Sequence, residues 1–128
     1  MATILIVEDD SSLRGLYKIA LNTFGFQVIG EASNGDEAIS IYKSLLEKPD
    51  LIIMDHRMPY KNGLETTKEI LRINKSAKII FASADRTIKG EALSCGAKFF
   101  LEKPFNNELL VKSIKKVLGN STIPINKS

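Results

Sequence analysis

The chain has 128 residues, of which 44% are hydrophobic and 26% charged, and its formal net charge at pH 7 is +3. This length fits one domain with a substantial core, and the single cysteine, Cys95, excludes a disulfide framework and favours a reducing compartment. No apolar stretch reaches the roughly 18 to 20 residues that span a bilayer, and no basic region precedes the first apolar run, so we expect a soluble, cytoplasmic protein without a signal peptide.

The first predicted elements are a buried strand and an amphipathic helix. Residues 4–7 form a continuous apolar run, which is typical of a strand covered on both faces. Apolar residues then recur at helical spacing between a start at Ser11-Ser12 and a stop at Gly25. These positions are Leu13, Leu16, Tyr17, Ala20, Leu21 and Phe24.

A second strand and helix precede the third strand. Residues 27–32 predict the strand, and Asn34 with Glu37 resembles a capping pair for the helix that follows. The apolar positions assigned to this helix are Ala38, Ile41, Tyr42, Leu45 and Leu46. Pro49 closes the helix, and a fully apolar strand, 51–54, leads to Asp55.

The second half of the chain continues the alternation of helices and strands. It predicts, in order, the helix 63–74, the strand 77–82, the helix 87–94, the strand 99–101 and the helix 107–118. The fourth helix is the weakest, because it contains a glycine and few apolar residues. Asn106 caps the last helix and Gly119 ends it.

Five strands that are each followed by a helix indicate right-handed crossovers and therefore a parallel sheet between two helical layers. We expect an α/β protein with a doubly wound, flavodoxin-like (βα)5 fold and the strand order 2-1-3-4-5. In that order the first and third strands are neighbours. Ligands of such sheets bind at the carboxyl ends of the strands.

Acidic residues follow two of these strands. Glu8-Asp9-Asp10 follows the first strand, and Asp55 ends the third. A carboxylate is a poor end for a buried strand unless a ligand needs it, so two neighbouring strands that end this way predict a shared site. We expect that site to bind a cation.

Four segments together carry a family resemblance. They are Ile4-Leu5-Ile6-Val7-Glu8-Asp9-Asp10, Met54-Asp55-His56-Arg57-Met58-Pro59 with Gly63 downstream, Ala82-Ser83-Ala84, and Glu102-Lys103-Pro104-Phe105. The chain resembles the receiver domain of two-component response regulators over about residues 3–119. The resemblance implies a receiver domain over 1–119 and a polar C-terminal tail over 120–128.

The resemblance implies that Asp55 accepts a phosphoryl group and that Mg²⁺, or Mn²⁺, is the cofactor. Asp9 and Asp55 would ligate the metal directly, Glu8 would act through a metal-bound water, and the backbone carbonyl of Arg57 would complete the protein ligands. Asp10 is then the extra acid, and we expect it to favour the start of the first helix.

The remaining residues of the implied site lie after the fourth and fifth strands. Lys103 would pair with Asp55 and then with the phosphoryl group, and its bond to Pro104 would be cis. Ser83 would supply the hydroxyl that follows the phosphoryl group, and Ala84 would leave room for the loop to move. Phe100 occupies the position of the family's switch aromatic, but without a phenolic hydroxyl.

Two more residues are placed to affect the lifetime of the phosphorylated state. Arg57 and Asp85 lie two residues beyond Asp55 and Ser83. We expect them to pair across the mouth of the site, shield the acyl phosphate and slow its hydrolysis. His56, the only histidine, receives no catalytic role, because a lone histidine makes neither a metal cluster nor a relay.

Other phosphate-handling folds fit less well. A haloacid-dehalogenase-like phosphatase needs Asp-x-Asp after its first strand, and a Toprim-like site needs Asp-x-Asp later, where this chain has Asp55-His56-Arg57. A flavodoxin needs a Ser/Thr/Gly-rich phosphate loop where this chain has three acids. The alternative that remains is an interaction module that keeps the receiver fold without using phosphorylation.

The expected function is that of a stand-alone signalling switch rather than a metabolic enzyme. A sensor histidine kinase or a histidine phosphotransfer protein would phosphorylate it, and an unidentified protein target would bind the face formed by the helix 87–94, the strand 99–101 and the last helix. The basic residues expected on that face, around Phe99 and Phe100, are Lys89, Lys98, Lys112, Lys115 and Lys116. The lysines do not alternate with stacking aromatics, so nucleic-acid binding is disfavoured.

Overall fold

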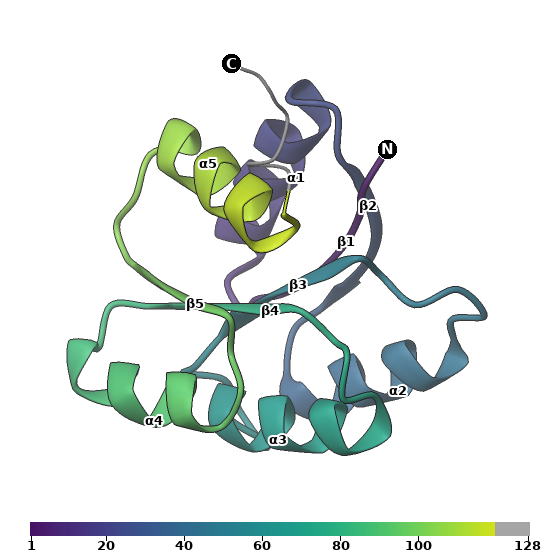
Figure 1. Ribbon diagram of the computed structural model, residues 1–128, viewed down its shortest axis with the longest axis vertical. Helices are drawn as coiled ribbons and strands as arrows, with labels where there is room; N and C mark the ends of the chain where they lie inside the picture. The colour runs from purple at the N-terminus through teal and green to yellow at the C-terminus, as the bar shows by residue number, and fades with distance from the viewer. Residues whose placement is uncertain (120–128) are drawn as a thin grey trace.

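The computed structural model of the protein describes residues 1–119 (Figure 1). The strands are β1 (Thr3–Val7), β2 (Gln27–Ala32), β3 (Leu51–Asp55), β4 (Ile79–Ser83) and β5 (Phe99–Glu102). The helices are α1 (Ser11–Thr23), α2 (Gly35–Ser44), α3 (Gly63–Ile73), α4 (Lys89–Ser94) and α5 (Asn107–Val117), and the 3₁₀ turn η1 (Arg86–Ile88) precedes α4. The predicted polar tail, 120–128, lies outside the described residues.

The predicted fold class and strand order are confirmed. All four strand pairings are parallel, and the sheet has the order β2-β1-β3-β4-β5. Figure 1 shows α1 and α5 on one face of the sheet and α2, α3 and α4 on the other. The first four helices therefore connect parallel strands, and α5 packs on the sheet after the last strand. Because the strands are parallel, the carboxyl ends of β1, β3, β4 and β5 lie along one edge of the sheet.

The core has two parts, one on each face of the sheet. Alternate residues of β1 point to opposite faces, so that Leu5 and Val7 join the cluster under α2, α3 and α4, whereas Ile4 and Ile6 join the cluster under α1 and α5. All four side chains are fully buried. This two-sided burial explains why the strands appear in the sequence as continuous apolar runs.

The caps of the helices agree with the sequence in most places. Asp10 is the N-cap of α1, because its side chain accepts hydrogen bonds from the amides of Ser12 and Leu13. Asn34 caps α2 and Asn106 caps α5 in the same way. The expectation that Asp10 belongs to the helix start is thus confirmed, and its exact role is a side-chain cap.

Several sequence boundaries were wrong. Leu46, assigned to α2, is fully exposed, because α2 ends at Ser44 and the Lys48 ammonium binds the free carbonyls of its last turn. Leu16 of α1 and Phe24, which follows the last residue of that helix, are exposed, so the buried apolar stripe is narrower than the sequence pattern predicted.

Two further boundaries differ in the second half. The fourth strand begins at Ile79 instead of 77, because Ala77 is still part of a turn and donates its amide to the Asn74 carbonyl. The predicted helix 87–94 begins with the 3₁₀ turn η1, where the Asp85 side chain caps the amide of Thr87, and becomes α-helical only from Lys89.

Candidate functional site

The ends of the strands bring the acidic residues together at one edge of the sheet. Glu8 follows β1 and Asp55 ends β3, and both residues are buried, with 2% and 6% of their surface exposed. Asp9 is exposed beside them. One carboxylate oxygen from each of these three residues lies within 4.8 Å of the others.

These three carboxylates fit a magnesium ion. In octahedral coordination at about 2.1 Å, two oxygens on opposite sides of Mg²⁺ are about 4.2 Å apart, so small shifts or one intervening water would let the three oxygens share an ion. Hard carboxylate oxygens are also the ligands that Mg²⁺ prefers. The carbonyl of Arg57 follows Asp55 closely in the chain, and its role as a ligand stays a prediction.

Lys103 supplies the fixed positive charge of the site. Its ammonium donates to Glu8 Oε1 at 2.8 Å and to Asp55 Oδ1 at 3.1 Å. The Lys103 amide donates to the Ser83 carbonyl at 2.9 Å, which ties the loop after β5 to the end of β4. The peptide bond between Lys103 and Pro104 is cis.

Burial and the neighbouring charges shift the pKa values of Glu8 and Lys103. Burial and the nearby Asp55 carboxylate raise the pKa of Glu8 to about 7, although the Lys103 ammonium opposes them. Burial lowers the pKa of Lys103, but the Glu8 and Asp55 carboxylates outweigh it, so the pKa of Lys103 lies above its ordinary value. One ammonium thus pairs with two buried carboxylates. Near neutral pH and without a metal, Glu8 is therefore protonated in a fraction of the molecules.

Neighbouring backbone groups hold Asp55 in place. The amide of His56 donates to Asp55 Oδ1 at 2.9 Å. Gly63, at the start of α3, packs so closely that a Cβ atom there would lie 2.2 Å from the Asp55 carbonyl oxygen. The amide of Gly63 also donates to the His56 carbonyl at 3.0 Å, so the chain returns tightly against the strand end after the β3–α3 loop.

Ser83 and Asp85 also belong to the site. Ser83 is buried, and its hydroxyl accepts a hydrogen bond from the Asp85 amide at 3.0 Å. Asp85 Oδ2 lies 3.8 Å from Nη2 of Arg57, so the predicted pair across the mouth is present. Hydrogen bonds from Thr87 are the main cause that lowers the pKa of Asp85, and Arg57 adds to them.

The site opens to solvent through a cleft of about 940 Å³. Its lining contains all of the predicted metal, phosphoryl and modulator residues except Phe100 and Pro104: Glu8, Asp9, Asp55, Arg57, Ser83, Ala84, Asp85 and Lys103. Asp10, Leu13 and Thr87 complete the lining. A small anion such as a phosphoryl group can therefore reach Asp55 from outside.

Phe100 lies away from the cleft, inside the core. It is buried, and its ring stacks on Phe81 with the ring centroids 6.2 Å apart. The His56 ring also packs against Phe81, and the centroids of these two rings are 5.7 Å apart. Within residues 1–119, His56 Nδ1 is one of two buried side-chain polar atoms that have no hydrogen-bond partner.

Sequence reasoning gave no site role to two residues of α1. Arg14 Nη1 donates to the Glu8 carbonyl at 2.7 Å, and its Nε lies 3.3 Å from Glu31 Oε1, so the side chain fixes the acidic loop to β2. Tyr17 stacks on Phe105 beside Lys103. Helical spacing places both residues on α1 close to the acidic cluster in sequence, but it does not predict these contacts.

Comparison with known proteins places these features in one family. The model of the response regulator receiver domain matches residues 4–115. A chemotaxis protein CheY of Thermotoga maritima is 42% identical over 116 residues, which cover 89% of this chain and 95% of that protein. Within residues 1–119, no helix has the length and apolar character needed to cross a membrane.

Two solved structures are similar in both fold and sequence. The response regulator TrrA of T. maritima, in complex with Mg²⁺-BeF, has a TM-score of 0.83 and 35% identity, covering 91% of this chain and 99% of that one. CheY in a CheX–CheY–BeF3–Mg²⁺ complex from Borrelia burgdorferi has a TM-score of 0.87 and 27% identity, with 91% and 88% covered.

Proposed function

Because the chain belongs to the response regulator receiver family, we propose that it is a stand-alone switch that takes a phosphoryl group onto Asp55. The donor is a sensor histidine kinase or a histidine phosphotransfer protein in the cytoplasm. The observation that carries the proposal is the grouping of the three acids Glu8, Asp9 and Asp55 around the ammonium of Lys103, at the base of an open cleft.

In the proposed reaction a carboxylate oxygen of Asp55 attacks the phosphorus of a phosphohistidine. The new O–P bond forms as the P–N bond of the donor breaks, and the departing imidazole keeps the electron pair and takes a proton from solvent. The three acids, with the Arg57 carbonyl, would hold the metal, which when bound neutralises phosphoryl charge and orients its oxygens. Lys103 remains an ammonium and passes from Asp55 Oδ1 to a phosphoryl oxygen.

The same event would move the loop after β4. The Ser83 hydroxyl, which accepts from the Asp85 amide in this structure, would turn to donate to a phosphoryl oxygen. Ala84 next to it has no bulk to resist that movement. Because Ser83 and Glu102 are paired in the β4–β5 register, a shift of the loop reaches the strand that carries Phe100. Phe100 already points into the core, so its part in the switch rests on its packing with Phe81.

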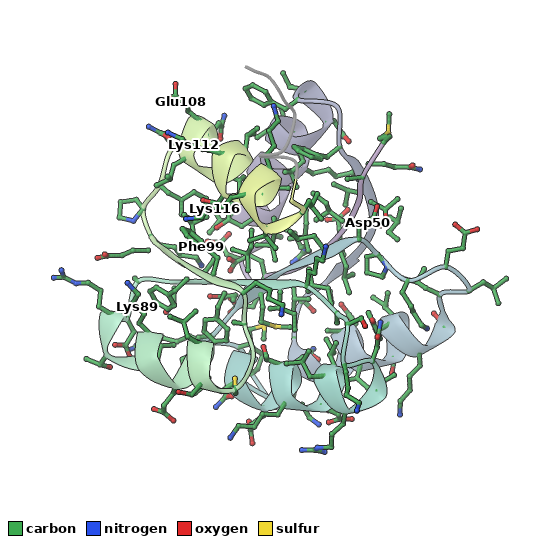
Figure 2. The ribbon with its side chains drawn as sticks, in the orientation of Figure 1. Asp50, Lys89, Phe99, Glu108, Lys112 and Lys116 are labelled. Carbon is green, nitrogen blue, oxygen red and sulfur yellow. The ribbon has the colours of Figure 1, made fainter. Side chains whose placement is uncertain are left out.

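The proposed output surface is the edge of the sheet formed by α4, β5 and α5. Figure 2 shows Lys112 and Lys116 on α5, Phe99 on β5 and Lys89 on α4 around this edge. The Lys116 ammonium lies 5.5 Å from the centre of the Phe99 ring. A basic rim around an aromatic residue fits an acidic protein partner, and the lysines would mainly raise the rate of association. The protein acts through this contact and is no metabolic enzyme.

The alternative is an interaction module that does not use phosphorylation, and beryllofluoride separates the two. We expect the amide spectrum of the ¹⁵N-labelled protein to change when beryllofluoride and Mg²⁺ are added, with the largest shifts in the loops after β3 and β4. Asp55→Asn should abolish the change. Asp10→Asn is the matched control, because it is the same substitution in the same cleft and asparagine also caps a helix.

A spectrum that does not respond, or a response that survives Asp55→Asn, would remove phosphorylation as the function. Mass spectrometry after incubation with phosphoramidate and Mg²⁺ gives an independent answer, because a phosphoryl group adds about 80 Da. The added mass should be absent from Asp55→Asn and present in Asp10→Asn.

A further inference from the structure

Tyr17 is a large residue of α1 that lies next to the site without lining its cleft. It is 6% exposed, although tyrosine is a residue of intermediate burial in most proteins. It lies one helical turn beyond Leu13 and one before Leu21, on the stripe of α1 that faces the sheet. This position brings its ring to the loop between β5 and α5.

The contact that Tyr17 makes there is a parallel ring stack. The centroids of Tyr17 and Phe105 are 5.7 Å apart, and the ring planes differ by 12°. Phe105 is only two residues beyond Lys103, and a small apolar cleft of about 170 Å³ is lined jointly by Leu13, Tyr17 and residues 103–105. The ring of Tyr17 is therefore part of the surface that contacts the loop 103–106 between β5 and α5.

The nearby acidic residues affect the pKa of the Tyr17 hydroxyl. Burial is the main cause that raises the pKa of Tyr17, and the negative charges of Glu8, Asp55 and Asp10 raise it further. The hydroxyl consequently stays protonated throughout the physiological range. The side chain thus offers a neutral ring to the loop and adds no further negative charge beside the three acids.

The loop 103–106, here called the lysine loop, is held by contacts of the Lys103 amide, the Lys103 ammonium and the Phe105 ring. The Lys103 amide is bound to the Ser83 carbonyl, and the Lys103 ammonium to Glu8 and Asp55. In the proposed reaction the loop after β4 moves, and the ammonium keeps Glu8 but exchanges Asp55 for a phosphoryl oxygen. The stack of Phe105 on Tyr17 involves no group that takes part in the chemistry.

We propose that Tyr17 is a positioning residue for phosphoryl transfer, whose ring holds Phe105 and thereby keeps Lys103 directed into the site. This inference rests on the proposed function, because a fixed Lys103 has a catalytic effect only where a phosphoryl group arrives. It assigns to α1 a part in the chemistry in addition to covering the sheet.

The test compares three α1 variants with the parent in phosphorylation by phosphoramidate and Mg²⁺. Tyr17→Leu removes the ring and keeps an apolar residue, whereas Tyr17→Phe removes only the hydroxyl. We expect Tyr17→Leu to lower the rate constant by about two- to tenfold, which is the range set by one aromatic pair, and Tyr17→Phe to keep the parent rate. Leu21→Ala is the control for general weakening of the same core cluster, and it should also keep the parent rate in buffer where it is folded.

Magnesium affinity provides the second measurement. If the lysine loop is released, Lys103 competes less for Glu8 and Asp55, so Tyr17→Leu should bind Mg²⁺ at least as tightly as the parent while reacting more slowly. A general collapse of the site would weaken both properties together. Phe105→Leu should reproduce the behaviour of Tyr17→Leu, and the double variant should be no slower than either single variant.

Several results would overturn the proposal. They are a parent-like rate for Tyr17→Leu, an equal loss in Tyr17→Phe, an equal loss in Leu21→Ala, and weaker Mg²⁺ binding that parallels the slower reaction. Failure of the proposed function would appear differently, because the parent protein itself would then acquire no phosphoryl group. The parent measurement thus separates the two hypotheses.

Discussion

The raised pKa of Glu8 leads to a specific dependence of magnesium binding on pH. Burial and the nearby Asp55 carboxylate raise the pKa of Glu8 to about 7 in the metal-free protein, although the Lys103 ammonium that the two acids share opposes them. A protonated carboxylic acid is a poor partner for a metal ion or its water, so the metal must displace that proton. Magnesium affinity should therefore fall as the pH is lowered through 7.

The size of the effect follows from the fraction of Glu8 that is ionised. With a pKa of about 7, that fraction is about nine in ten at pH 8 and about one in ten at pH 6, so the affinity for Mg²⁺ should fall about tenfold between them. With the ordinary value of 4.5, Glu8 would be ionised at both pH values and the affinity would hardly change. Calorimetric titration with MgCl₂ at pH 6, 7 and 8 measures this directly.

The control is Glu8→Gln, which keeps an oxygen that can accept from Lys103 but cannot be ionised. Its affinity for Mg²⁺ should be lower than that of the parent and nearly independent of pH over this range. Equal affinities of the parent at pH 6 and pH 8 would refute the reasoning, as would a pH dependence that is unchanged in Glu8→Gln.

The raised pKa of Glu8 also predicts how the free energy of unfolding of the metal-free protein, measured in EDTA, depends on pH. A folded-state pKa above the unfolded value means that the folded protein binds the proton more tightly, so the contribution of Glu8 is greatest below about pH 4.5 and is lost as the pH rises to about 7. At about 1.4 kcal/mol for each pKa unit, the loss is about 3 kcal/mol. Urea unfolding at pH 5 and pH 8 measures this loss. The free energy of unfolding should decrease more between pH 5 and pH 8 in the parent than in Glu8→Gln.

Three further predictions concern the loops around the site. Gly63→Ala should lower the free energy of unfolding by at least about 2 kcal/mol, because the new Cβ would collide with backbone, whereas Gly15→Ala on an open helix surface should raise it by up to about 1 kcal/mol in the same urea titration. Tyr60 is 85% exposed with φ of 70°, so Tyr60→Gly should stabilise the protein by about 1 kcal/mol and Tyr60→Ala should not. Arg57→Ala and Asp85→Ala should each speed loss of the phosphoryl group about two- to fivefold, as measured by the decay of phosphoprotein, because an exposed ion pair is a weak interaction. Equal decay rates in the parent and both variants would remove the shielding role.

The fold could be predicted from the sequence because its strands are buried on both faces. A continuous apolar run such as 4–7 or 51–54 has few structural alternatives, and a helix after each strand permits only a parallel sheet. The errors lie where local pattern and tertiary packing disagree. Leu46 completes an apolar pattern, yet the backbone turns extended at Leu45, so α2 ends before Leu46, and the Lys48 ammonium binds the carbonyls left at that end.

The site could be predicted in part, for a similar reason. Residues such as Glu8 and Asp55 lie directly after strands, so the topology alone brings them to one edge of the sheet. The contacts of Arg14 and Tyr17 depend on how far α1 leans toward the neighbouring loops, and no local signal encodes that distance. The position of Phe100 in the core was equally open from the sequence, because an aromatic residue in an edge strand can point inward or outward.

The two oxygens of Glu8 explain how one residue can serve both the metal and the lysine. Oε1 accepts from the Lys103 ammonium at 2.8 Å, while Oε2 accepts from the Asp10 amide at 3.3 Å. In the proposed reaction the single negative charge of Asp55 is replaced by about two on the phosphoryl group, and the ammonium must follow that charge outward. Because Glu8 keeps hold of Lys103, the ammonium can exchange Asp55 Oδ1 for a phosphoryl oxygen without leaving its second partner. Glu8→Ala should therefore slow phosphorylation more than Glu8→Gln at saturating Mg²⁺, since only glutamine preserves that hold.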